Sequence, residues 1–222
     1  MSKIFQIAID GPSGAGKSTI AKRVAEELAI DYIDTGAMYR AVGLKMIRNG
    51  IPMEENETLF EMLRNTDVDF SEGKVYLDGE DVSGFIRTQE VSKAASDCSA
   101  FAAVRRKLVE LQQAMGKRKS VIMDGRDIGT VVLKDAEYKF YLTATAEERA
   151  MRRFRELQAK GSTDTYEKVL EDVNKRDYND MHREVDPLRQ AEDAVLIDST
   201  NMNIEEVVDF VIEAVTGEDI RK

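Results

Sequence analysis

The chain has 222 residues, 42% of them hydrophobic, which is enough to bury one compact core and argues against a disordered chain. Its net charge of −10 repels a nucleic-acid backbone, so we expect small-molecule partners and no nucleic acid. The single cysteine, Cys98, excludes an internal disulfide and a structural zinc site, and the first apolar run is too short for a signal peptide or a membrane span, so we expect a cytoplasmic protein with no membrane partner.

Short apolar runs alternate with helical patterns along the chain. Ile20, Val24 and Leu28, for example, repeat with the spacing of a buried helix face. This alternation predicts an α/β fold with a five-stranded parallel sheet flanked by helices. The five runs expected to form buried strands are 4–9 (IFQIAI), 31–33 (DYI), 120–123 (SVIM), 139–144 (KFYLTA) and 194–197 (AVLI).

The turn after the first run satisfies G-x-x-x-x-G-K-[ST], the P-loop pattern, between a strand and a helix. Its backbone N–H groups are expected to hold a β-phosphate, Lys17 to bridge the β- and γ-phosphates, and the Ser18 hydroxyl to bind Mg²⁺. The sequence therefore predicts a bound nucleoside triphosphate and Mg²⁺, with Lys17 as a catalytic residue. The residues expected to bind the nucleotide are Gly11, Ser13, Gly14, Ala15, Gly16, Lys17, Ser18 and Thr19.

Two further segments, "DTGAMYR" at 34–40 and "DGRDIG" at 124–129, are predicted as loops at strand ends. The carboxyl ends of parallel strands open onto one crevice, so both loops should face the P-loop. Arg40 and Arg126 are then placed to hold one phosphate from two sides. Asp124 ends an apolar strand, the position of a carboxylate that orients Mg²⁺.

The stretch from Asp67 to Ser92 carries short β-type segments, with Asp78-Gly79 as a hairpin turn. It predicts a small antiparallel sheet in a lobe inserted between helices. Ser99 is expected to cap a helix that runs from Phe101 to Met115.

Two helical patterns, 145–161 and 163–187, flank Gly161-Ser162, and Pro187 is expected to close the second. This arrangement predicts a short helical lid. Basic side chains within it fit a lid that closes over phosphates, but they also fit solvated ion pairs. They are Arg149, Arg152, Arg153 and Arg155 in the first pattern, and Arg176 and Arg183, on one face with Asp180, in the second.

One motif points elsewhere. Asn174–Asp177 matches the N-K-x-D string that reads guanine in GTPases, but no apolar strand precedes it. We therefore do not expect a GTPase.

The combined strings "IDGPSGAGKST", "DTGAMYR", "LDGEDVSGFIRTQEVSKAAS", "DGRDIGTVV" and "KRDYNDMHREVDPL" strongly resemble bacterial cytidylate kinases, P-loop enzymes that phosphorylate CMP and dCMP with ATP. The resemblance runs from about Ile4 to Val215. It implies a monomeric single kinase domain over 1–222 that uses ATP and Mg²⁺. The implied parts are a core at about 1–35, 118–150 and 190–222, a monophosphate-binding lobe at about 36–117 and a lid at about 151–189.

The resemblance also implies roles for individual residues, beside the predicted metal ligands Ser18 and Asp124. Thr35, Tyr39 and Arg40 would border the acceptor nucleotide, with Arg40, Arg126 and Arg183 near its phosphate. Ser96, Arg105 and Asp127 would read cytosine, Arg176 and Asp180 would hold the ribose, and Arg153 would reach the transferring phosphoryl group.

Three alternatives stay open from the residues themselves: a nucleoside monophosphate of another base, such as UMP or AMP; a non-nucleotide acceptor such as shikimate; and an ATP-binding regulator that acts through a partner.

Overall fold

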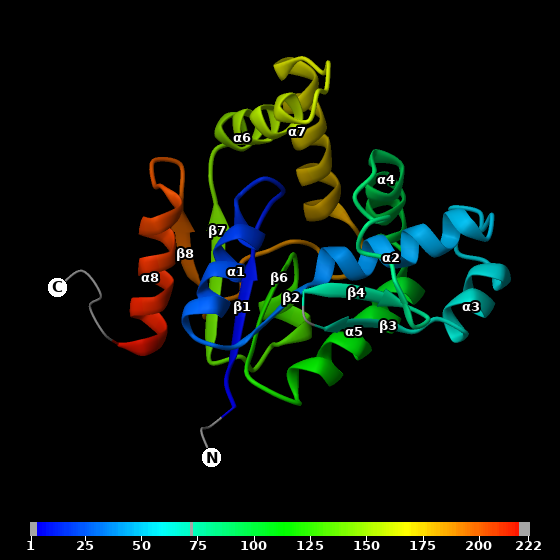
Figure 1. Ribbon diagram of the computed structural model, residues 1–222, viewed down its shortest axis with the longest axis horizontal. Coiled ribbons are helices and arrows are strands. Elements are labelled where there is room, and N and C mark those ends of the chain that lie inside the picture. The colour runs from blue at the N-terminus through cyan, green and yellow to red at the C-terminus, as the bar shows by residue number, and fades with distance from the viewer. Residues whose placement is uncertain (1–3, 72, 218–222) are drawn as a thin grey trace.

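The computed structural model describes residues 4–71 and 73–217, so the ends of the predicted 1–222 domain lie outside the described residues. Within them, five strands form one parallel sheet in the order β2-β6-β1-β7-β8 (Figure 1). This confirms the predicted sheet. The strands are β1 (Gln6–Asp10), β2 (Asp31–Asp34), β6 (Val121–Gly125), β7 (Tyr138–Thr143) and β8 (Val195–Asp198).

The two faces of the sheet bury different side chains, because successive residues of a strand point to opposite sides. In β1, Ile7 and Ile9 face a cluster with Val24 of α1 (Lys17–Glu27) and Val208 of α8 (Ile204–Thr216). Ala8 joins the second and larger cluster on the other face. The helices therefore cover both faces, as the pattern predicts.

The second face carries the inserted lobe. Its helices are α2 (Thr35–Arg48), α3 (Glu57–Arg64), α4 (Gln89–Cys98) and α5 (Ala102–Gly116), and its antiparallel sheet consists of β3 (Val68–Ser71), β4 (Lys74–Leu77) and β5 (Glu80–Asp81). Asp78 and Gly79, with φ of 51° and 84°, form the turn between β4 and β5. Two consecutive residues with positive φ make the tight turn that suits antiparallel strands, so the predicted hairpin is confirmed.

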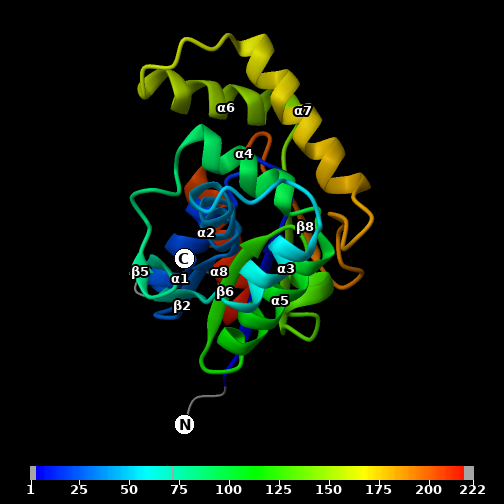
Figure 2. The same ribbon diagram turned by 90° about the vertical axis from the view of Figure 1, so that its right-hand side faces the viewer.

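The helices α6 (Ala146–Ala159) and α7 (Tyr166–His182) form a hairpin that rises above the carboxyl edge of the sheet (Figures 1 and 2). They share a small core of their own in which Ala150 packs against Val169 and Val173. The two predicted helices are thus confirmed, although α7 ends at His182, before Pro187.

Two local predictions were wrong. The segment "DTGAMYR" is no loop, because α2 begins directly after β2 and Asp34 caps it. The hydroxyl of Ser99 donates to the Ser96 carbonyl at the end of α4, so it does not cap α5. The Asp34 side chain accepts from the Ala37 N–H in the helix that follows it, whereas Ser99 bonds to the helix that precedes it.

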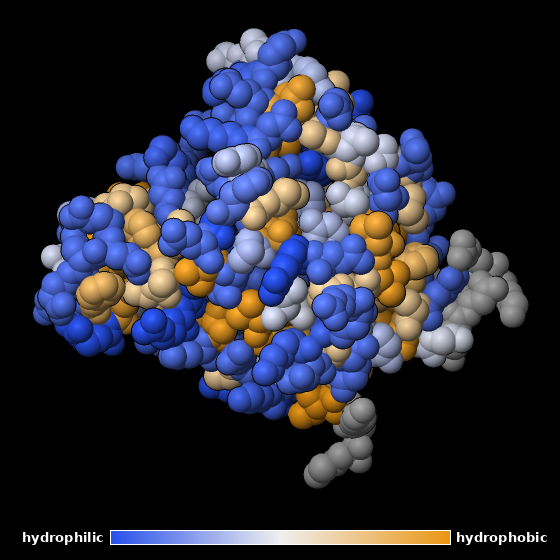
Figure 3. Space-filling view, turned by 180° about the vertical axis from the view of Figure 1, so that it is seen from behind, coloured by the Kyte–Doolittle hydropathy of each residue, from blue (hydrophilic) through white to orange (hydrophobic). Residues whose placement is uncertain are grey.

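The last strand, β8, was expected to be buried, yet Val195 and Leu196 are 44% and 55% exposed. An edge strand has a neighbour on one side only, which explains this exposure. From behind, the molecule shows a largely hydrophilic surface with hydrophobic residues in several places (Figure 3). None of the described helices is both long and apolar enough to cross a membrane.

Candidate active site at the carboxyl edge of the sheet

A cleft of about 870 Å³ opens at the carboxyl edge of the sheet, between the P-loop, the inserted lobe and the α6–α7 hairpin. Eleven Lys and Arg and seven Asp and Glu line it, so the cleft is locally basic in a chain whose net charge is −10. Such a cleft attracts anions. Apart from Gly11, every residue predicted to bind or react lines it, although this placement does not test their roles: Ser13, Gly14, Ala15, Gly16, Lys17, Ser18, Thr19, Thr35, Tyr39, Arg40, Ser96, Arg105, Asp124, Arg126, Asp127, Arg153, Arg176, Asp180 and Arg183.

The P-loop connects β1 to α1. Gly11 has a φ of 151°, and a Cβ there would collide with the Leu142 carbonyl oxygen of β7. Only glycine therefore lets the loop pass this close to β7. Gly16 brings no side chain to cap α1, which leaves the first turn of that helix suited to bind an anion. Lys17 is 6% exposed, and its Nζ donates to the Pro12 carbonyl at 2.8 Å. Burial, helped by nearby Arg126, lowers the pKa of Lys17 to about 7.

Oxygen atoms that suit Mg²⁺ lie beside the P-loop. The Ser18 hydroxyl donates to Asp124 Oδ2 at 2.8 Å, and the Tyr32 hydroxyl donates to Oδ1 at the same distance. Burial and the neighbouring Asp34 raise the pKa of Asp124. A hydroxyl and a carboxylate in contact fit a hard cation that also keeps phosphate and water ligands. Among the residues described, no group of three or more His, Cys, Asp or Glu side chains is arranged to hold a metal.

Arg40 of α2, Arg126 after β6 and Arg176 of α7 lie near one another in the lining of the cleft. Arg126 donates from Nε to Asp180 Oδ2 at 2.7 Å, and Arg40 donates to Asp34 at 3.0 Å. The Nε atoms of Arg40 and Arg176 are buried, and neither has an acceptor among the described residues. Burial and the nearby arginines lower the pKa of Arg176 to about 10. Buried guanidinium donors without acceptors mark a place for an anion.

A second polar network lies farther into the lobe. Arg105 is 1% exposed, donates from Nη1 to the Ser99 carbonyl at 3.3 Å, and pairs through Nη2 with Asp127. Its guanidinium lies 5.8 Å from the ring centroid of Tyr39. Burial raises the pKa of Asp127, although Arg105 and Arg183 oppose this. The network joins a carboxylate to guanidinium groups beside an aromatic ring, which suits a flat polar ligand such as a base.

The segment after α7 closes this network. Arg183 donates from Nε to the Asp186 carbonyl at 2.8 Å, and Arg105 donates from Nε to Asp186 Oδ2 at 3.0 Å. Sequence reasoning gave Asp186 no role.

Asp10, at the end of β1, is a second residue to which the sequence assigned no role. This buried carboxylate accepts from the N–H groups of Ile128 and Gly129 at 2.8 and 2.7 Å, and so fixes the π-helical turn Ile128–Val132 that follows Arg126 and Asp127. Burial raises the pKa of Asp10 to about 7.

Arg149, named above among the basic side chains of the lid, makes contacts that the sequence does not predict and that link the lid hairpin to the P-loop. Arg149 of α6 is buried, donates to the Ser13 carbonyl at 2.9 Å, and pairs with Asp177 of α7 at 2.6 Å. Asp177 is the aspartate of the N-K-x-D string, which lies wholly inside α7. The GTPase-like match is therefore coincidental, and its aspartate serves an ion pair.

Two other basic side chains of the lid, Arg152 and Arg153, line the cleft. Arg153 lines the cleft, but it is about half exposed and its Nη1 donates to Glu156 at 3.1 Å. Arg152 contacts the carbonyl of Ser199, in the segment after β8. Part of this segment, Ser199, Met202, Asn203, Ile204, Glu205 and Val207, also lines the cleft, and sequence reasoning missed it.

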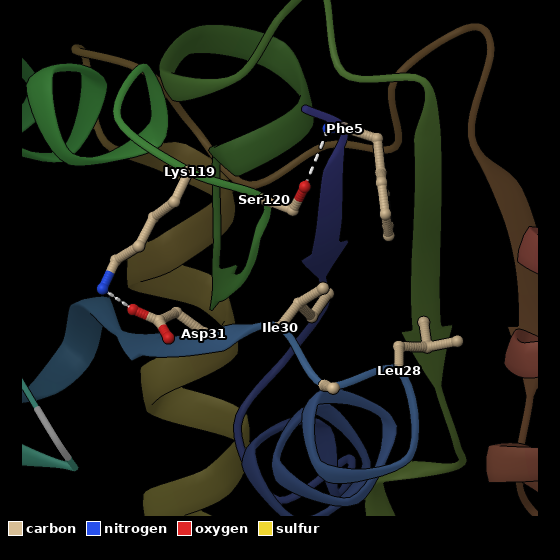
Figure 4. Close-up of a pocket in the computed structure, with 7 residues that line it drawn as sticks. Phe5, Leu28, Ile30, Asp31, Lys119 and Ser120 are labelled. Atoms are coloured by element: carbon tan, nitrogen blue, oxygen red, sulfur yellow. Dashed lines mark hydrogen bonds and ion pairs between the residues drawn. The ribbon is translucent and has the colours of Figure 1, made fainter. Parts of the chain in front are cut away.

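A smaller cavity of about 400 Å³ lies at the opposite, amino edge of the sheet (Figure 4). Lys119 pairs there with Asp31, and the Phe5 N–H donates to the Ser120 hydroxyl at 3.1 Å. These polar groups hold strand ends together, and ligands of parallel sheets bind at the other edge.

Comparisons with known proteins identify the family of the chain. A family model described as cytidylate kinase matches residues 7–217. The cytidylate kinase of Caldicellulosiruptor saccharolyticus is 56% identical over 215 residues, which cover 95% of both chains. That of Clostridium acetobutylicum is 52% identical and covers 96% of this chain and 98% of its own.

Solved structures resemble the fold at low sequence identity. Shikimate kinase from Bacteroides thetaiotaomicron has a TM-score of 0.51 at 13% identity, covering 96% of this chain and 99% of that one. An uncharacterized protein from Eubacterium ventriosum has a TM-score of 0.54 at 12% identity, covering 97% of this chain and 100% of that one. These two likenesses concern the fold alone.

Proposed function

The chain belongs to the cytidylate kinase family, and we propose that its cleft transfers the γ-phosphoryl group of ATP to CMP or dCMP, giving ADP and CDP or dCDP. The observation that carries the proposal is the pair of buried Nε atoms, those of Arg40 and Arg176, which have no acceptor among the described residues and share the P-loop's cleft. A nucleoside monophosphate supplies the acceptor oxygens that these donors lack.

Transfer needs positioning and charge neutralisation more than proton transfer. The acceptor phosphate is already ionised near neutral pH, so no strong general base is required. Lys17 binds the β- and γ-phosphates, while Arg40, Arg126 and Arg176 hold the acceptor phosphate in line with them. The family resemblance implies that Arg176 and Asp180 hold the ribose. We place Arg176 at the phosphate instead, because Arg126, Arg40 and Arg153 lie near it as well as Asp180, and leave the ribose to Asp180.

The donor side would hold Mg²⁺ through Ser18 and Asp124, whose contact at 2.8 Å presents two oxygen ligands. When bound, the ion neutralises charge on the β- and γ-phosphates. The segment after β8 would cover the adenine, and Arg153 would reach the transferring group when the hairpin closes and excludes water.

Base choice rests on Asp127 and Arg105. Cytosine has a 4-amino donor and an N3 acceptor, which match a carboxylate beside a guanidinium. Uracil reverses both groups and would leave buried polar atoms unpaired, at about 1–3 kcal/mol or a five- to 150-fold discrimination. Shikimate has no base that could occupy the network of Arg105 and Asp127. An ATP-binding regulator would not need a network that recognises a base.

The remaining parts of the proposal concern the whole chain. We propose a cytoplasmic monomer with small-molecule partners and no nucleic acid, supported by the acidic net charge and the family. The division into a core, a monophosphate-binding lobe and a lid, with the bounds given above, is proposed from the family alone.

The test is ADP formation from Mg²⁺ and ATP with CMP, dCMP, UMP, AMP, GMP, shikimate or no acceptor. We expect fast turnover with CMP and dCMP over a near-zero blank. In the variant Asp127→Asn, the ratio of kcat/KM for CMP to kcat/KM for UMP should be lower than in the wild type. An amide can donate a hydrogen bond to uracil as well as accept one from cytosine. An unchanged ratio would show that Asp127 does not recognise the base. If no acceptor raised ADP formation above the blank, the ATP-binding regulator would be the better hypothesis.

A further inference from the structure

Asp186 occupies an unusual position between the end of α7 and Pro187. Its φ is 48°, in the left-handed region, where a side chain other than glycine costs about 1–2 kcal/mol. Two arginines engage it there: its carboxylate accepts from Arg105 Nε at 3.0 Å, and its carbonyl accepts from Arg183 Nε at 2.8 Å. The strained backbone thus turns both acceptors toward the arginines of the base pocket.

The contacts of Arg105 show what the carboxylate of Asp186 does. Arg105 divides its donors among Asp186, the Ser99 carbonyl and Asp127. Arg183 lies 3.5 Å from the other oxygen of Asp127. Arg105 and Arg183 therefore contact Asp127 and Asp186, while Asp180, which pairs with Arg126, also favours the positive charge of Arg183. Without Asp186, Asp127 would be the only carboxylate that pairs with Arg105, and the base pocket would carry one negative charge less.

We propose that Asp186 is a positioning residue that determines base specificity. Resting on the proposed function, this inference assigns Asp186 the task of keeping Asp127 available to the 4-amino group of cytosine. It does so by accepting the hydrogen bond from Arg105 Nε and by pairing with the positive charge of Arg105. A pocket that lacks the carboxylate of Asp186 accepts the electronegative O4 of uracil more readily.

The test is the variant Asp186→Asn. Asparagine adopts positive φ more readily than most residues, so the backbone and the carbonyl contact with Arg183 are retained while the charge is removed. We expect the CMP-over-UMP ratio of kcat/KM to fall about five- to tenfold, since one charge-assisted hydrogen bond is weakened. The KM for ATP and the Tm should stay near those of the wild type. Asp186→Gly, which keeps the backbone but has no carboxylate, should lower the ratio as well.

The matched control is Glu184→Gln, which removes one negative charge from an exposed side chain two residues away. It should leave the ratio unchanged. If Asp186→Asn keeps the wild-type ratio, or slows CMP and UMP equally, Asp186 supports the fold only and the inference is overturned. The wild type in the same assay separates the two proposals, because wild-type enzyme without CMP-dependent turnover contradicts the proposed function itself.

Discussion

Lys17 is the buried cation at the donor end of the cleft. Replacing it, Lys17→Met, removes the charge that would bind the transferring phosphates, and we expect kcat to fall by about three orders of magnitude. The fold should survive with an unchanged or higher Tm, because a buried amine with a pKa of about 7 is replaced by an apolar chain of similar length. Steady-state rates and a thermal melt measure both effects, and Lys134→Ala, an exposed lysine, is the control. Near-normal turnover in Lys17→Met would contradict its role.

Asp10 links the stability of the protein to pH. Its pKa is 3.8 in an ordinary environment and about 7 in the fold, so between these values the folded state binds more protons than the unfolded state. Its contribution to stability is therefore full below about pH 4 and is lost as the pH rises through 7. We expect the Tm of Asp10→Asn, relative to wild type, to rise from pH 4 to pH 7, because asparagine does not titrate.

Thermal melts across that range test this expectation. Asp69→Asn, which changes an exposed aspartate of β3, should show no such relative rise. Parallel Tm curves for wild type and Asp10→Asn would show that Asp10 does not titrate in this window.

At the scale of single residues, what the sequence predicts depends on how local the interaction is. Lys17 and Ser18 belong to a contiguous motif whose chemistry follows from its order. Asp10 meets Ile128 across 118 positions, and Arg149 meets Ser13 across 136, so no local pattern announces either contact. The residues expected to read cytosine were found by family resemblance.

At the scale of elements, strands and helices followed hydrophobic periodicity, whereas their ends followed capping. The five strands and the β4–β5 hairpin are confirmed because apolar runs and a tight turn specify them directly. The start of α2 at Thr35 was missed because Asp34 serves as its cap, and a lone aspartate after a strand suits a turn equally well.

The helix α7 is held to the P-loop side of the cleft by the Arg149–Asp177 pair. In Asp177→Asn the buried Arg149 loses its negatively charged partner, and we expect the free energy of unfolding to fall by about 1–3 kcal/mol. The KM for CMP should rise several-fold although Asp177 binds no substrate in our proposal, because Arg176 and Asp180 lie on the same helix. Initial rates at varied CMP and a denaturant melt measure the two effects.

The matched control is Asp172→Asn on the exposed side of the same helix, where the aspartate pairs with Lys168. An exposed i,i+4 pair contributes little, so this variant should keep the wild-type KM. Equal KM values for the two variants would show that the Arg149–Asp177 pair does not position the acceptor site.

At the scale of the whole molecule, an acidic protein surrounds a basic cleft. The net charge predicts the absence of a nucleic-acid partner, but it hides the concentration of arginines at one edge of the sheet, because composition averages over positions. Only the fold brings together residues from the P-loop, the inserted lobe, the segment after β6 and α7.

The contact of Arg149 with both the P-loop and α7 has a consequence for how the two substrates bind. One end of this connection is the Ser13 carbonyl at the donor site, and the other is the helix that carries Arg176 and Asp180. If ATP strengthens the connection, it raises the affinity for CMP by some factor, and CMP must then raise the affinity for ATP by the same factor. We therefore expect heterotropic cooperativity, in which CMP that arrives without ATP is weakly retained and soon dissociates.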